Sequence, residues 1–135
     1  MHDGMDIAVV TLDLNKSLLN YSGAKNPLYL VKNGTLIEFK ADKTPISYSR
    51  VMAPYTNNII DIEKGDYIYI FSDGFADQFG GPDNKKFRYS QFRNLLIRLN
   101  GEPMKKQKKI LETTFYEWKG NHDQVDDVLV IGIRI

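Results

Sequence analysis

The first half of the chain alternates short apolar runs with polar turns, which is typical of β-strands. Apolar and β-branched residues fill residues 7–14, 18–22, 28–32 and 35–40, and Asn33-Gly34 separates the last two runs. Both residues of an Asn-Gly pair tolerate positive φ, so this pair predicts a two-residue hairpin turn. We therefore expect an antiparallel meander in this half of the chain.

A long connection and two further strands follow. Residues 41–55 contain two prolines and many polar side chains, and we expect no regular structure there. Residues 57–62 and 66–71 are the next apolar runs, and the polar segment 63–66 predicts a turn that pairs them. The run before Ser72 is mostly apolar, which favours a strand in the middle of a sheet.

Helical spacing appears only after Gly74. We expect one short helical turn over 75–79 and an exposed loop over 80–86, where glycine and proline interrupt any regular element. Residues 128–135 predict a final strand that is apolar enough to lie centrally in a sheet.

Two amphipathic helices are expected between the loop and the final strand. Ser90 is a favourable N-cap for the first helix, which should end at Asn100-Gly101. The second helix should occupy residues 103–120, since proline suits a first turn and glycine suits a helix end. The apolar stripes are Phe92, Leu95, Leu96 and Leu99 in the first helix, and Met104, Gln107, Leu111, Phe115 and Trp118 in the second.

This order of elements predicts an α+β fold, with antiparallel β-sheets flanked by helices. The 135 residues are enough for one domain with a buried core, and we expect a single domain over residues 1–135. A net charge of +1 gives no reason to expect a nucleic-acid or membrane partner. The lysines at 105, 106, 108 and 109 are interpreted as a solvated helix face.

The sequence lacks cysteines and long apolar runs, which excludes some kinds of site and argues against a membrane span. The chain has no cysteine, which excludes disulfides and thiolate metal sites. No apolar run approaches the roughly 18 residues of a membrane span, and the N-terminus lacks the pattern of a secretory signal. A cytoplasmic location is therefore the default expectation.

Acidic residues stand at the ends of two predicted strands. Asp73-Gly74 directly follows the apolar run 67–71, and Asp126-Asp127 precedes the final strand. Carboxylates fixed at strand ends are suitable ligands for a hard cation such as Mg²⁺ or Mn²⁺. Two alternatives remain open at this point: Asp73 could cap the next helical turn, and the pair could be an acidic turn. The metal hypothesis requires Asp73 and Asp126 to converge in space.

Four segments of the chain together resemble one protein family. Residues 71–81 (FSDGFADQFGG) and 124–133 (QVDDVLVIGI) look like the last two motifs of the bacterial SpoIIE/RsbU-type phosphatases, which belong to the metal-dependent protein phosphatase (PPM, type 2C) superfamily. Residues 3–8 and 23–30 resemble earlier segments of that family, in the same order. The resemblance covers nearly the whole chain and implies part of an α-β-β-α phosphatase sandwich.

The resemblance also implies a reaction and a set of residues. The superfamily hydrolyses phosphoserine and phosphothreonine in proteins with two Mn²⁺ or Mg²⁺ ions that make a water molecule more acidic, so no catalytic side chain is implied beyond the metal ligands. By motif position, Asp73 and Asp126 correspond to metal ligands, Gly74 to a backbone pivot and Asp127 to a supporting residue. The implied substrate is a phosphoprotein that resembles an anti-sigma-factor antagonist in bacterial signalling.

The chain departs from the family pattern in one respect. The family's bridging Asp is followed closely by Gly-His-Gly, and no such segment exists in this sequence; only Asp3-Gly4 could imitate it. The chain is therefore interpreted as a C-terminal part of a phosphatase domain that binds metal weakly, is inactive alone and forms a homodimer through uncovered sheet edges. The alternatives are a non-catalytic phosphatase-like interaction domain, and an unrelated binding module whose acidic residues are caps and turns.

Overall fold

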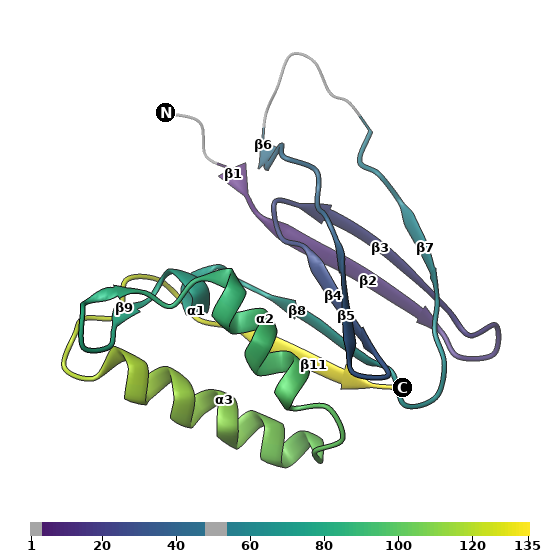
Figure 1. Ribbon diagram of the computed structural model, residues 1–135. Coiled ribbons are helices and arrows are strands. Elements are labelled where there is room, and N and C mark those ends of the chain that lie inside the picture. The colour runs from purple at the N-terminus through teal and green to yellow at the C-terminus, as the bar shows by residue number, and fades with distance from the viewer. Residues whose placement is uncertain (1–3, 48–53) are drawn as a thin grey trace.

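Two antiparallel sheets and a pair of helices form three layers (Figure 1). The computed structural model describes residues 4–47 and 54–135. A four-stranded sheet has the order β11-β8-β4-β5, and a three-stranded sheet has the order β2-β3-β7. The bounds are β11 Val130–Arg134, β8 Tyr67–Phe71, β4 Leu28–Lys32 and β5 Thr35–Phe39 in the first sheet, and β2 Ile7–Asp13, β3 Leu18–Ala24 and β7 Asn58–Asp61 in the second.

The remaining elements are short strands and the helices. β1 pairs with β6, and β9 pairs with β10, in two small antiparallel ladders. Figure 1 shows α2 and α3 next to each other on the outer side of the sheet that contains β8 and β11. The bounds are β1 Gly4–Met5, β6 Ile46–Ser47, β9 Phe79–Gly80, β10 Lys85–Lys86, α1 Gly74–Asp77, α2 Tyr89–Arg98 and α3 Met104–Lys119.

The four-stranded sheet is the middle layer because its two central strands, β4 and β8, are apolar on both faces. Side chains alternate across a strand, so each strand serves two cores. In β4, Leu28 and Leu30 join the core against the three-stranded sheet, whereas Tyr29 and Val31 join the core against the helices. β8 divides in the same way, with Ile68 on the inner side. Burial on both faces holds β8 in place, and β8 is the strand that leads into Asp73.

Several sequence-based predictions are confirmed. The α+β class with antiparallel sheets holds, and β4 and β5 form the hairpin predicted from Asn33-Gly34, whose φ values are 50° and 77°. α2 and α3 bury the expected stripes, and α3 ends at Gly120 with φ 52°. The four lysines of α3 are exposed, as predicted. No helix in the described part of the chain is long and apolar enough to cross a membrane.

The predicted strand pairing is wrong in two places. The first half is not a continuous meander: β2 and β3 pair in one sheet, and β4 and β5 pair in the other. Residues 58–61 and 67–71 do not pair with each other, because β7 joins β3 whereas β8 lies between β4 and β11. The turn at 63–66 crosses between the layers, which lets Ile60 and Ile62 meet Ile68 in the inner core.

Four local predictions also need correction. The final strand lies at a sheet edge, not in the centre, although it is apolar. The loop 80–86 contains part of the β9-β10 hairpin, and the connection 41–55 contains β6, with residues 48–53 outside the described part. α2 begins at Tyr89 with Arg88 in the N-cap position, so Ser90 is not the cap.

Candidate metal centre

Asp73 lies two residues after the end of β8, and its side chain does not cap the following helix. Its backbone lies at the N-cap position of α1, with φ −77° and ψ −9°, and the side chain makes no capping hydrogen bond. The Asp77 amide donates to the Asp73 carbonyl oxygen at 3.0 Å, so only backbone closes this turn. The helix-cap alternative from the sequence is therefore wrong, and the carboxylate of Asp73 is left for another partner.

Ser72 joins the end of β8 to the segment that contains the acidic pair. The Ser72 amide donates to the Leu129 carbonyl oxygen at 3.0 Å, which continues the β8-β11 ladder beyond Val130. The Ser72 hydroxyl donates to the Asp127 carbonyl oxygen and accepts from the Leu129 amide, both at 3.0 Å. These three bonds fix the acidic segment beside Asp73.

Gly74 allows the acidic segment to approach α1 closely. A Cβ at this position would lie 2.2 Å from the Asp127 carbonyl oxygen, a distance that no side chain can occupy. The glycine is required here by this contact with the neighbouring backbone, and not by a positive φ. Gly74 therefore permits a close approach of two backbone segments, and its role as a backbone pivot stays a prediction.

Gln78, from inside the protein, holds residues 123–125, which precede the acidic pair. Its side chain is completely buried, and its amide nitrogen donates to the Asp123 carbonyl oxygen at 2.8 Å. Its side-chain oxygen accepts from the Val125 amide at 3.3 Å, and its backbone carbonyl accepts from the Trp118 indole at 2.9 Å. A buried glutamine with all of these bonds rigidifies the loop, since losing any of them would leave a buried polar group unpaired.

The structure brings Asp73 and Asp126 together. Partial burial raises the pKa of Asp73, and the negative charges of Asp126 and Asp77 raise it further. The Asp126 carboxylate is oriented by the backbone of the next residue, because its Oδ1 accepts from the Asp127 amide at 2.7 Å. Asp77 is partly neutralised by Lys86, whose Nζ lies 3.6 Å from its carboxylate. The site therefore gathers negative charge, which a cation would neutralise.

These donors fit part of a coordination sphere for a hard cation. Two carboxylates are suitable oxygen ligands for Mg²⁺ or Mn²⁺, which keep several waters when few protein ligands are present. Within residues 4–47 and 54–135, no group of three or more acidic, histidine or cysteine side chains could hold a metal. Asp3, the possible imitation of the bridging residue, lies outside the described residues. That Asp73 and Asp126 bind metal, with Asp127 in support, stays a prediction.

Sequence reasoning missed Ser72, Asp77 and Gln78. Ser72 and Asp77 lie next to the Asp-Gly step, and their proximity in sequence is the signal that could have marked them. Gln78 is a polar residue within the predicted helical turn 75–79, and nothing in the local pattern indicates that it is buried. Its role depends on residues 123–125, more than 40 positions away.

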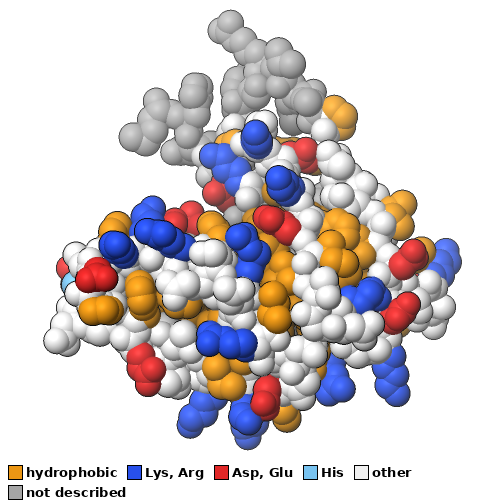
Figure 2. Space-filling model, viewed as in Figure 1, with side chains coloured by type: hydrophobic (Ala, Val, Ile, Leu, Met, Phe, Trp, Pro, Cys, Tyr) orange, Lys and Arg blue, Asp and Glu red, His pale blue; other side chains and the backbone are white. Residues whose placement is uncertain are grey.

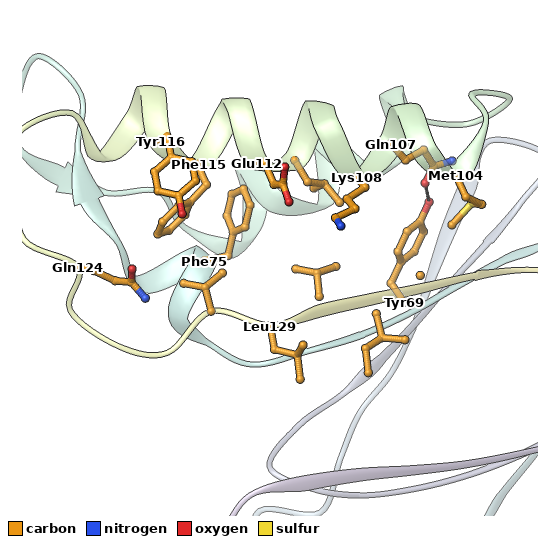
Figure 3. A pocket seen from close by; sticks show the side chains of 15 residues that line it. Tyr69, Phe75, Met104, Gln107, Lys108, Glu112, Phe115, Tyr116, Gln124 and Leu129 are labelled. Atoms are coloured by element: carbon orange, nitrogen blue, oxygen red, sulfur yellow. Dashed lines mark hydrogen bonds between the residues drawn. The ribbon is translucent and has the colours of Figure 1, made fainter.

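A groove opens beside the site, between α3 and the edge strand β11 (Figure 3). Its volume is about 610 Å³, and its lining is mostly apolar. At one end the Tyr69 hydroxyl donates to the Gln107 side-chain oxygen at 2.6 Å, and both residues are buried. Leu129 and Ile131 of the open side are 56% and 42% exposed, so an apolar strand edge faces the solvent.

The sequence model of the family described as Stage II sporulation protein E (SpoIIE) matches residues 3–135. The chain belongs to the SpoIIE family. Members of this family are PP2C-type serine/threonine phosphatase domains of the PPM superfamily, so the reading of the chain as an unrelated binding module is wrong. No curated protein sequence gives a significant match.

Solved structures support the same assignment. The SiaA-PP2C domain of Pseudomonas aeruginosa is 28% identical, with a TM-score of 0.89 over 96% of this chain and 51% of that chain. The phosphatase domain of SpoIIE from Bacillus subtilis is 13% identical, with a TM-score of 0.68 over 96% of this chain and 58% of that chain. The catalytic domain of PstP, solved with two manganese ions, is 14% identical, with a TM-score of 0.64 over 96% and 57%.

The matches to SpoIIE from Bacillus subtilis and to PstP show a shared fold alone, because their sequence identity to this chain is low. The SpoIIE-family domain described here spans about half the length of the chains it matches.

Proposed function

We propose that this chain takes part in the hydrolysis of phosphoserine in a phosphoprotein, as a portion of a metal-dependent serine/threonine phosphatase. The observation that carries the proposal is that Ser72 and Gly74 hold the acidic pair beside Asp73, although Asp73 and Asp126 are 53 positions apart in the sequence. Family membership supports the reaction class.

In this proposal Asp73 and Asp126 hold Mn²⁺ or Mg²⁺. A bound ion of this kind supplies a more acidic water and neutralises charge on the transferring phosphoryl group. Asp73 must be ionised to act as a ligand, although its pKa is raised in the metal-free protein. Gly74 and Ser72 keep the acidic segment in place, and Asp127 supports Asp126 through its backbone amide.

We further propose that the isolated chain binds metal weakly and turns over little or no substrate. Two carboxylates leave most of an octahedral sphere to water, and Mg²⁺ and Mn²⁺ are held more tightly when more carboxylates contribute. The chain would then be the C-terminal part of a larger catalytic domain. The second candidate, a non-catalytic interaction domain, is favoured by the same lack of a third acidic ligand among residues 4–47 and 54–135.

The partner and the cellular setting remain proposals. A phosphoprotein resembling an anti-sigma-factor antagonist, a role in bacterial signalling and a cytoplasmic location rest on family analogy.

Self-association of the isolated chain is supported by two sheet edges, β11 and β2, with exposed apolar side chains such as Ile131 and Val9. A dimer in light scattering at high protein concentration would agree with this proposal, and a strictly monomeric mass would contradict it.

Manganese titration followed by calorimetry tests the metal centre. Wild-type protein should bind Mn²⁺, and Asp73→Asn and Asp126→Asn should each lose most of the affinity. Asp83→Asn is the matched control, since Asp83 is an exposed loop residue that loses the same charge. Equal binding by the wild type and both site variants would contradict the metal centre.

Activity distinguishes the enzyme from the interaction domain. The chain is mixed with a separately expressed segment that carries the family's Asp and Gly-His-Gly motif, and Mn²⁺-dependent release of phosphate from a phosphoserine peptide is followed. Release that requires Asp73 supports the phosphatase, whereas binding without release supports the interaction domain.

A further inference from the structure

A second hollow, of about 310 Å³, lies between α2 and the neighbouring ends of β4 and β5. Figure 2 shows Lys and Arg side chains gathered on this face, over α2 and the adjoining ends of the strands, with acidic side chains among them. We call this hollow the basic pocket. The residues of its lining that matter here are Lys25, Tyr29, Glu38, Lys40, Tyr89 and Arg93.

The basic pocket has an excess of positive charge. Lys25, Lys40 and Arg93 face a single carboxylate, that of Glu38. In the part of the chain that the structure describes, none of the three cations lies within 4.0 Å of a carboxylate oxygen, whereas Lys32, Lys86 and Lys106 all do. Cations that line one hollow create a local potential that favours an anion.

Lys25 is held in an unusual backbone conformation at the pocket. Its φ is 64°, a left-handed value that a lysine adopts only when its surroundings impose it. The Lys25 amide donates to the Asp42 carbonyl oxygen at 2.8 Å, and the Asp42 amide donates to the Gly23 carbonyl oxygen at 2.9 Å. These bonds fix the strained turn. Strain of this kind gathers at ligand sites, where it orients a side chain before the ligand arrives.

Arg93 brings a guanidinium to the lining of the basic pocket. The residue is half-buried on α2. Burial raises the pKa of the neighbouring Tyr29, and Arg93 opposes that rise. A guanidinium suits a carboxylate, because two parallel N–H groups match its two oxygens.

The basic pocket adjoins the candidate metal centre. Both tyrosines of its wall pack against Phe71, the last residue of β8, with ring centroids 4.7 Å away for Tyr29 and 6.3 Å away for Tyr89. Asp73 follows Phe71 by two positions. Tyr89 lines the pocket and packs on Phe71, and neither Asp73 nor Asp126 belongs to the pocket lining. Burial, then the charges of Asp73 and Asp77, raise the pKa of Tyr89 to about 12.

We propose that the basic pocket binds an acidic side chain of the phosphoprotein substrate, located a few residues from the phosphoserine. This inference rests on the proposed function and adds a specificity site to it. A carboxylate fits better than a long polyanion such as a nucleic acid, because the hollow is small and Glu38 limits its net charge.

The test measures the binding of labelled phosphoserine peptides in the presence of Mn²⁺ by fluorescence anisotropy. One set carries a single glutamate at successive positions around the phosphoserine, and the reference peptide carries alanine instead. At least one glutamate peptide should bind about tenfold more tightly than the reference. Lys25→Gln combined with Lys40→Gln should abolish that difference. Lys105→Gln combined with Lys109→Gln, the same charge change on the exposed face of α3, should retain it.

A second measurement separates this inference from the proposed function. An unphosphorylated peptide with two glutamates is added to ¹⁵N-labelled chain without metal, and amide shifts are recorded. Shifts at Lys25, Tyr89 and Arg93 that disappear in the double variant support the pocket even if no phosphate is ever released. Absence of these shifts, or a glutamate preference that survives in the double variant, overturns the pocket and leaves the phosphatase proposal untouched.

Discussion

The Cα of Gly74 and the carbonyl oxygen of Asp127 approach so closely that a Cβ on Gly74 would lie 2.2 Å from that oxygen. The obstruction would be backbone, which cannot move aside as the end of a side chain can. The position of the whole acidic segment therefore depends on the absence of one methyl group.

Gly74→Ala should destabilise the protein and displace Asp126 from Asp73. We expect a loss of at least about 2 kcal/mol in the free energy of unfolding, as for other overpacked sites. Urea denaturation and Mn²⁺ titration measure the two effects. Gly101→Ala is the control: its φ of 88° strains alanine, but a Cβ there meets nothing within 4 Å. It should lower stability and leave Mn²⁺ affinity unchanged.

Ser72→Ala should weaken metal binding more than it weakens the fold. The variant loses the hydroxyl bonds to Asp127 and Leu129 but keeps the backbone bond to Leu129. We expect a stability loss of about 1 kcal/mol and a tenfold or greater fall in Mn²⁺ affinity, the roughly 10- to 100-fold range of residues that orient metal ligands. Ser90→Ala, on the exposed start of α2, should change neither. Unchanged affinity in Ser72→Ala would show that the hydroxyl does not position the site.

Asp73→Asn should stabilise the metal-free protein at neutral pH. The pKa of Asp73 is raised in the folded state, so ionisation there opposes folding. The free energy of unfolding of the wild type should rise as pH falls through this raised pKa. At lower pH the wild type and the variant should have the same free energy of unfolding. The gain should stay below about 1 kcal/mol, because the side chain is exposed and solvent screens it. Thermal unfolding from pH 7 to pH 3 measures it, and a destabilised variant at pH 7 would contradict it.

Lys32→Met should destabilise the protein through the buried carboxylate of Asp66. The Lys32 Nζ lies 2.7 Å from Asp66 Oδ2, and Asp66 is only 3% exposed. Leaving a buried carboxylate without its partner costs about 1–3 kcal/mol, whereas Lys106→Met, which breaks the exposed pair with Glu102, should cost less than about 0.5 kcal/mol. Urea denaturation of both variants at pH 7 makes the comparison.

The same ion pair predicts a dependence on alkaline pH. The hydrogen bond to Asp66 raises the pKa of Lys32 above its ordinary value of 10.5. The stabilisation should be complete below pH 10.5 and should be lost as pH rises through the raised value. Lys32→Met should not show this loss, so the stability of the two proteins should converge at high pH.

The sequence determined those elements whose signals are local. Asn33-Gly34 predicts its hairpin because both residues accept positive φ, and the stripes of α2 and α3 predict their buried faces because helical spacing is regular. Asp73 and Asp126 could be selected as a candidate site because each stands at a strand end, and because the surrounding motifs resemble one family.

Tertiary structure alone decided which strands pair and what lies beside the site. Residues 58–61 and 67–71 have the sequence of a hairpin, yet each gains more burial by joining a different sheet around a shared core. β11 is apolar enough for a central strand, but the pattern of one strand does not reveal how many neighbours it has. Gln78 acquires its role from hydrogen-bond partners that are distant in the sequence, and Lys25 is placed by a strained turn. Burial and proximity are properties of the assembled layers and not of any one segment.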